Sequence, residues 1–125
     1  MAWKSLFLTA LIVVTLLGGC QGERQSLVVT ATAYNSVPSQ TDGQPNLAAW
    51  GDDLQPGMKA IAVSPDLIDL GLTHGTKVSI EGLPGSYTVL DKTARRHTKR
   101  IDLYMGTDVE AAREWGVKEV RITWR

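Results

Sequence analysis

The stretch Val89–Gly106, VLDKTARRHTKRIDLYMG, contains the end of one predicted strand and the whole of another. Apolar residues alternate with other side chains in Arg100–Tyr104, which is typical of a strand with one buried face. Asp91 and Asp102 stand eleven positions apart in these strand-forming parts, and the connection between them is rich in positive charge. Two interpretations follow: a solvated loop between strands, or a site that handles an acidic polymer, with one carboxylate supplying a proton.

Strand signals continue on both sides of this stretch. β-Branched and alternating apolar residues predict six strands in all, which are Leu27–Tyr34, Met58–Val63, Thr76–Glu81, Ser86–Leu90, Arg100–Tyr104 and Val117–Trp124. The turn Gly82–Gly85 joins two of them into a hairpin. Because six short strands would leave exposed edges unless they closed on themselves, the pattern predicts a mainly β fold, a closed barrel.

Two short helices and one long loop separate these strands. Ser64 followed by Pro65 has the residues of a helix start, with Ser64 as the N-cap. The segment Thr107–Glu110 has the pattern of a capping box and opens a second helix. The loop, residues 35–57, contains three prolines, three glycines and Trp50. A loop of that length inside a small domain usually has a functional role.

The N-terminus has the features of an export signal. Lys4 precedes an apolar run, Leu6–Leu17, which is shorter than the ~20 residues of a membrane-spanning helix but suits a signal peptide. The run ends in Leu17-Gly18-Gly19-Cys20, which resembles the lipobox of bacterial lipoproteins. We expect Cys20 to be lipidated; the alternative is an ordinary signal peptide followed by an unrelated cysteine.

The expected organisation follows from this reading. Residues 1–19 form the signal peptide, residues 20–26 a lipidated tether, and residues 27–125 one domain. The residue after the lipidated cysteine is Gln21 rather than Asp, which favours an outer-membrane location. The expected arrangement is a lipid anchor in that membrane, with the domain facing the periplasm.

Charge and motif content narrow the function classes. Removal of Lys4 leaves 12 basic and 13 acidic side chains, a net charge near −1, so nothing in the balance favours nucleic acid as a partner. The single cysteine excludes a disulfide within the chain. The sequence has no CxxC, HExxH, GxSxG or phosphate-binding glycine loop. His74 and His97 lie in different segments, and we expect no metal and no cofactor.

Asp102 is the candidate for chemistry that the residues themselves single out. Alternation places Ile101 and Leu103 on one face of their strand, so Asp102 and Tyr104 share the other. An acid inside an apolar strand needs a partner or a purpose. The structural alternative is that Asp102 pairs with Arg100, its neighbour on the same face.

Several segments together resemble the 3D domain, a family named for three aspartates that includes the catalytic module of membrane-bound lytic transglycosylase A. The resemblance covers nearly all of Leu27–Arg125. It is carried by TATAY (Thr30–Tyr34), KAIAVSPDLI (Lys59–Ile68), LD (Leu90–Asp91), RIDLYMG (Arg100–Gly106) and EAAREWGVKEVRI (Glu110–Ile122).

The resemblance implies a six-stranded double-psi β-barrel and cleavage of the β-1,4 bond between N-acetylmuramic acid and N-acetylglucosamine in peptidoglycan, with a 1,6-anhydro product. The family's catalytic aspartate falls on Asp102, and its companion falls on Asp91. One carboxyl group would protonate the leaving oxygen and then accept the proton of the sugar's 6-hydroxyl. Asp91 would raise the pKa of Asp102 by like-charge repulsion.

The sequence departs from the family in three ways. Ser64 stands where the family usually has its first aspartate, and Asp66 follows it on the predicted helix. A basic segment replaces the glycine-rich one that often follows Asp91, and its charge would lower the pKa of Asp102. The second domain of the larger transglycosylase has no counterpart here. The alternative function is therefore a peptidoglycan-binding lipoprotein of the same fold that does not cleave glycan.

Substrate contacts are expected around the aspartates. Peptidoglycan stem peptides carry free carboxylates, which basic side chains in the connection would bind. Trp50 would stack on a sugar ring or, alternatively, anchor the base of the long loop in the core. The expected binding residues are Arg95, Arg96, Lys99, Arg100, Tyr104 and Trp50.

The lipobox generates a direct prediction. Cys20→Ser removes the thiol that would carry the lipid, so the variant should remain an unlipidated precursor. In detergent phase separation, the wild-type protein should partition with the membranes and the variant should lack the lipid-dependent mass. Recovery of all wild-type protein in the soluble periplasmic fraction would contradict the prediction.

Overall fold

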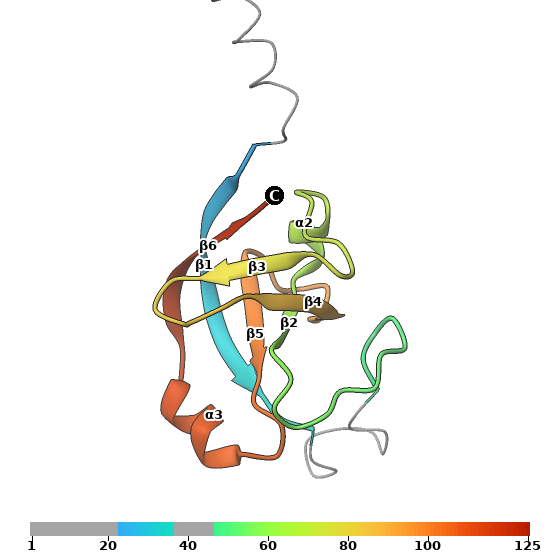
Figure 1. Cartoon of the computed structure of the whole chain (residues 1–125), viewed down its shortest axis with the longest axis vertical. Helices are drawn as coiled ribbons and strands as arrows, with labels where there is room; N and C mark the ends of the chain where they lie inside the picture. Colours follow the sequence, from blue (N-terminus) through green and yellow to red (C-terminus); the bar gives the residue numbers. More distant parts are fainter. Residues whose placement is uncertain (1–22, 37–46) are drawn as a thin grey trace, which may run out of the picture.

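The computed structural model describes residues 23–36 and 47–125. It confirms the predicted class: the described chain is mainly β, a closed six-stranded mixed barrel with two short helices (Figure 1). The elements are β1 (Gln25–Tyr34), β2 (Ala60–Val63), α2 (Pro65–Ile68), β3 (Lys77–Ile80), β4 (Tyr87–Lys92), β5 (Arg100–Tyr104), α3 (Val109–Trp115) and β6 (Lys118–Trp124).

Some expectations lie outside the described residues. These are the signal peptide, the lipobox with Cys20, and residues 37–46 of the long loop. Gln25 already belongs to β1, so this strand begins two residues earlier than the sequence predicts and includes the end of the expected tether. No helix in the described part of the chain is long and apolar enough to cross a membrane.

The barrel combines parallel and antiparallel neighbours. Its strand order is β1-β5-β2-β4-β3-β6, and β6 closes the ring on β1. The pairs β1·β5 and β2·β4 are parallel, whereas β2·β5, β3·β4, β3·β6 and β1·β6 are antiparallel. The predicted hairpin is therefore present as β3 and β4. In this order β5 and β2 are neighbours, and both lie between β1 and β4.

Alternation in the sequence decides which face of each strand enters the core. In β5, Ile101 and Leu103 are buried in the main core cluster, as their spacing predicts. All four residues of β2 are buried, and Ile61 and Val63 belong to the same cluster. The other face of β2 is therefore covered as well, and the candidate site lies there.

The helix starts differ in detail from the predictions. Ser64 occupies the N-cap position of α2, but its side chain makes no capping hydrogen bond. Its hydroxyl oxygen instead accepts the main-chain N–H of Arg100 at 3.0 Å. At α3 the N-cap is Asp108, not Thr107, and its carboxylate accepts the N–H of Ala111 at 3.0 Å. The capping-box prediction is thus wrong by one residue, because Asp is as good an N-cap as Thr.

The start of β5 is tied to both of its neighbours. The N–H of Ser64 donates to the carbonyl of Arg100 at 2.9 Å, the reciprocal of the hydroxyl contact. On the other side, the N–H of Thr30 donates to the carbonyl of Lys99 at 2.8 Å. The N–H of Lys99 donates to the carboxylate of Asp66 at 2.9 Å. Lys99 has a φ of 45°, and these contacts hold it in that uncommon conformation.

The end of the long loop packs closely against the turn after β5. Gly106 has a φ of +57°, and a Cβ placed there would lie 3.0 Å from the main-chain Cα of Pro56. The N–H of Ser36 also donates to the carbonyl of Gly106 at 2.9 Å. Glycine is required at this position for both its conformation and the close approach of Pro56.

Gly106→Ala should therefore destabilise the barrel more than an alanine at a glycine without neighbours. Gly82, in the β3–β4 turn, has a φ of +86° and no atom near the added Cβ, so it provides a control. We expect a loss of about 1 kcal/mol for Gly82→Ala and roughly 2–3 kcal/mol for Gly106→Ala, measured by urea unfolding. Equal losses of stability in the two variants would show that Pro56 moves away from the added Cβ at little cost in free energy.

Candidate active site

Strand register brings the two candidate aspartates to one small residue. Ala62 of β2 pairs with Asp102 of β5 on one side and with Asp91 of β4 on the other. Asp102 pairs in turn with Thr32 of β1. Because directly paired residues point to the same face of a sheet, these four side chains form one row across four strands. We call Thr32, Asp102, Ala62 and Asp91 the aspartate row.

An irregularity in β4 places Asp91 in this row. Ile61 pairs with Val89, but Ala62 pairs with Asp91, so Leu90 is the extra residue of a β-bulge. In a regular ladder, Leu90 would face Ala62 and Asp91 would share the side of Val63, inside the core. A bulge shifts the facing of every residue after it. Here it directs the carboxylate of Asp91 to the same face as that of Asp102.

Asp91 is held by several donors. The hydroxyl of Tyr34 donates to Oδ2 at 3.1 Å. The main-chain N–H groups of Ala49 and Lys92 donate to Oδ1 at 2.8 and 2.9 Å. Tyr34 belongs to β1, which β5 and β2 separate from β4, so its side chain extends across the central strands to reach Asp91. These contacts fix the carboxylate of Asp91 as a hydrogen-bond acceptor.

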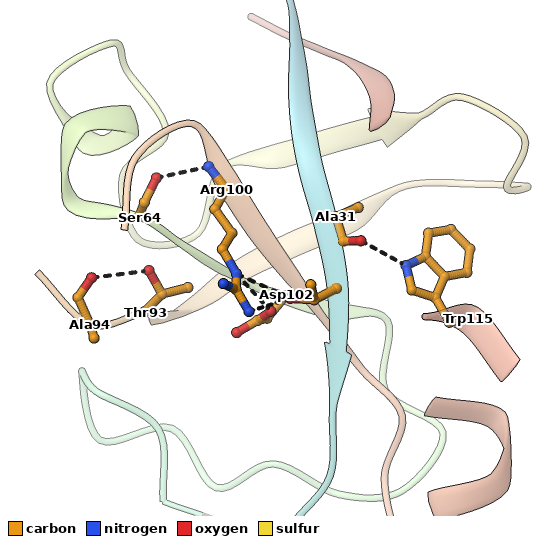
Figure 2. A network of polar contacts seen from close by, with 8 residues as sticks. Ala31, Ser64, Thr93, Ala94, Arg100, Asp102 and Trp115 are labelled. Atoms are coloured by element: carbon orange, nitrogen blue, oxygen red, sulfur yellow. Dashed lines mark hydrogen bonds and ion pairs between the residues drawn. The ribbon is translucent and has the colours of Figure 1, made fainter. Parts of the chain in front are cut away.

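Asp102 is less completely paired. Its side chain is 19% exposed, and its Oδ1 lies 3.6 Å from Nε of Arg100 (Figure 2). At this distance the two groups form an ion pair but no hydrogen bond. The Oδ1 atom of Asp102 is buried and has no hydrogen-bond partner among the described residues. A buried carboxylate with an open acceptor position is poorly solvated. It is the group in the row that is least stabilised as an anion.

The pKa of Asp102 is raised above its ordinary value, and burial is the largest cause. The charges of Arg100 and His97 act in the opposite direction, and repulsion from Asp91 adds a smaller upward effect. Burial therefore outweighs the basic neighbours. The like-charge effect of Asp91 has the direction that the sequence predicts, but it is not the main reason for the shift.

Arg100 has a second partner besides Asp102. Its Nε and Nη2 atoms donate to the hydroxyl oxygen of Thr32 at 3.2 and 3.1 Å. The structural alternative considered for Asp102, a pairing with Arg100, is thus present in the fold. Because Thr32 also binds the guanidinium group, protonation of Asp102 does not leave Arg100 without a partner.

Two tyrosines lie beside the aspartate row. Tyr34 and Tyr104 pair across β1 and β5, and their ring centroids are 5.6 Å apart. Burial, together with the nearby charges of Asp91 and Asp102, raises the pKa of Tyr34, so its hydroxyl stays protonated and acts as a donor. The hydroxyl of Tyr104 shares a 2.7 Å hydrogen bond with Ser36.

Tyr104, an expected binding residue, is only 4% exposed. It contributes to a cavity of about 300 Å³ that Met58, Tyr87 and Met105 also line. Little of its surface is therefore open to a ligand. Tyr34, which sequence reasoning did not single out, is the tyrosine that contacts a candidate carboxylate.

The other expected binding residues lie around the row rather than in it. Arg95, Arg96 and Lys99 are exposed on the connection between β4 and β5. Trp50 packs partly against the core, with the ring of His74 at 5.1 Å and Nζ of Lys92 at 5.1 Å from its own ring. These contacts support the alternative that Trp50 anchors the base of the long loop.

The loop that carries Trp50 is held beside Asp91 by a hydrogen bond and by a contact with His74. Nε2 of His74, which is exposed, lies 2.6 Å from the carboxylate of Asp52. The N–H of Ala49 binds Asp91, as described above. This part of the loop thus forms a wall on the β4 side of the aspartate row.

The row can act as a proton-transfer site for a bound polar ligand. It contains one partly buried acid with a raised pKa, one carboxylate held by donors, and a small alanine between them. Two strand spacings separate Asp102 from Asp91, or about 10 Å between their Cα atoms.

No protein-family model matches the chain, and no curated protein shows significant similarity to it.

The opposite pKa directions of Asp102 and Asp66 generate a paired prediction. The raised pKa of Asp102 means that its ionisation lowers stability as pH rises from 3.8 through the folded-state value. Asn at this position removes that loss, so Asp102→Asn should gain stability relative to wild type as pH increases. Urea unfolding between pH 3 and pH 7 measures the difference.

Asp66→Asn is the matched control with the reverse sign. Burial opposes ionisation of Asp66, but hydrogen bonds from Ser64 and from the N–H of Lys99 lower its pKa overall. Its contribution to stability is present above 3.8 and is lost as pH falls through the folded-state value. Asp66→Asn should therefore be least stable, relative to wild type, at neutral pH. The same sign for both variants would refute the assignment.

Proposed function

We propose that this protein is a lytic transglycosylase that cleaves the β-1,4 bond between N-acetylmuramic acid and N-acetylglucosamine in peptidoglycan and forms a 1,6-anhydro product. The observation that carries the proposal is the aspartate row, in which a β-bulge and strand register direct Asp91 and Asp102 to one face on either side of Ala62. The mixed barrel is compatible with the double-psi fold of 3D domains, which the sequence resembles.

Asp102 serves as the acid and then as the base. In its protonated form it donates to the glycosidic oxygen as the bond from that oxygen to the anomeric carbon breaks. The resulting carboxylate accepts the proton of the 6-hydroxyl as its oxygen bonds to the anomeric carbon. The net change moves one proton between two sugar oxygens and needs no added water. A raised pKa favours the first step.

Arg100 stabilises the carboxylate form of Asp102, which acts as the base in the second step. The guanidinium group lies 3.6 Å from Asp102 and stabilises the carboxylate formed when the proton leaves. Its hydrogen bonds to Thr32 hold it in place when Asp102 is protonated. Burial and the guanidinium thus favour opposite protonation states, which suits a group that alternates between them.

Asp91 acts as the positioning partner in this proposal. Its hydrogen bonds to Tyr34 and to the N–H of Ala49 connect the row to β1 and to the loop wall. The exposed Arg95, Arg96 and Lys99 stand outside the row, where they would bind carboxylates of stem peptides. The proposal includes an outer-membrane anchor through Cys20, with the domain in the periplasm.

The alternative is a peptidoglycan-binding lipoprotein that does not cleave glycan. The observation that favours it is the Arg100 contact, which lowers the pKa of Asp102 and so opposes the acid form. A binding protein would use the same exposed cations without a proton transfer. Product analysis separates the two functions.

The decisive experiment is digestion of purified sacculi, with the products separated by mass. Asp102→Asn should lower release of anhydro-muropeptides by about 10²–10⁴-fold or more, because Asn keeps the shape of the side chain but cannot deliver a proton. Asp91→Asn should lose less activity and shift the pH optimum slightly downward, since Asp91 contributes only a small part of the raised pKa of Asp102.

Asp69→Asn makes the same chemical change at the exposed end of α2 and should retain full activity. Urea unfolding of each variant separates loss of chemistry from loss of fold. If wild-type protein binds sacculi and yields no anhydro products, the binding function replaces the enzyme.

A further inference from the structure

A basic depression lies at the end of the barrel where the described chain starts and stops. Its volume is about 380 Å³. The lining side chains carry three positive charges and no negative one. They are Arg24, Thr76, Lys77, Ser79, Thr123, Trp124 and Arg125. We call this the terminal depression.

Strand pairing assembles the terminal depression from distant parts of the chain. Gln25 pairs with Trp124, so the arginines that flank this pair, Arg24 and Arg125, lie near each other, and Figure 1 shows the chain end beside the start of β1. Ser79 pairs with Thr123, which places two hydroxyl side chains across one ladder. The depression is therefore a product of the fold rather than of one basic segment.

The polar groups of the terminal depression fit a phosphate. Nζ of Lys77 donates to the hydroxyl oxygen of Thr88 at 2.7 Å, which holds that cation at the barrel wall. Arg24 and Arg125 take part in no ion pair with another described residue. Guanidinium groups bind phosphate oxygens through two parallel N–H bonds, and hydroxyls donate to the remaining oxygens.

The covalent chain fixes the terminal depression near the expected lipid. Arg24 follows Cys20 by four residues, and four extended residues span at most about 14 Å. Whatever path residues 21–23 take, a lipid on Cys20 would keep Arg24 within that distance of the membrane surface. Anionic lipid headgroups, which attract basic side chains near a membrane surface, are within reach at this range.

We propose that the terminal depression binds the phosphate of an anionic membrane headgroup and so orients the barrel on its membrane. The proposal shares the expected anchor at Cys20 with the proposed function but is independent of glycan cleavage. β1 rises about 3.3 Å per residue, so Thr32 of the aspartate row lies up to roughly 25 Å from Arg24 along the strand. A docked headgroup would thus hold the candidate active site away from the lipid surface.

The first test measures anion binding by the lipidated protein in a neutral detergent. The probes are inorganic phosphate and glycerophosphoglycerol, the headgroup of phosphatidylglycerol without its acyl chains. Both should shift the amide resonances of Ser79 and Thr123. Replacement of Arg24, Lys77 and Arg125 by Gln should weaken binding at least about tenfold. The Gln variants of Lys59, Arg113 and Lys118, which are exposed and lie outside the depression, remove the same charge and should bind as wild type does.

The second test uses vesicles and separates a headgroup site from a free-phosphate site. Lipidated protein is placed in phosphatidylcholine vesicles that carry a dansyl lipid, with or without phosphatidylglycerol. Because Trp124 lines the depression, energy transfer from tryptophan to dansyl should rise with phosphatidylglycerol in wild-type protein and in the control variant, but not in the variant of the depression.

The outcomes are distinct. Binding of inorganic phosphate with no response to glycerophosphoglycerol or to phosphatidylglycerol vesicles would overturn the headgroup assignment. No response to either soluble probe would overturn the site itself. If the triple variant unfolds, the single variant Arg125→Gln, at the end of the described chain, provides the same comparison.

Discussion

The main chain of Lys99 and Arg100 enters β5 between two neighbours that hold it from both sides. Ser64 exchanges two hydrogen bonds with Arg100, through its N–H and its hydroxyl, while Thr30 binds the carbonyl of Lys99. These contacts set the register of β5 against β2 and β1 together. A slip of one residue would turn Ile101 and Leu103 out of the core and Asp102 into it. Core packing and the aspartate row therefore depend on the same few main-chain bonds.

Ser64 also explains one departure from the resemblance to 3D domains. A serine hydroxyl at the end of β2 accepts the N–H of Arg100 without introducing another buried charge. The nearby acid, Asp66, binds the N–H of Lys99 and supports the turn into β5. In this chain, then, the acid after β2 supports the connection, and Asp91 and Asp102 are left as the pair that shares a face.

Strand positions were predictable because local patterns determine them. Arg100–Tyr104 has the predicted limits, since its alternation coincides with burial on one side. The aspartate row was not predictable, because strand order and the bulge at Leu90 depend on pairing between distant segments. The role of Tyr34 was missed for the same reason: nothing in TATAY indicates a partner on β4. The direction of the pKa shift of Asp102 was not predictable either. The charges of Arg100 and Asp91 are visible in the sequence, but the extent of burial, which decides the shift, is not.

The pairing of β1 has a consequence for the order of folding. Its two neighbours, β5 and β6, are the last strands of the chain, and Thr30 meets Arg100 across seventy positions. Such non-local ladders carry a large loop-closure entropy and slow the folding of β proteins. During synthesis, β1 is made before β5 and β6, so it must stay unpaired until these strands follow it. The barrel can close only after β6 has been made, and until then β1 is an open strand edge that is exposed to wrong pairing and aggregation.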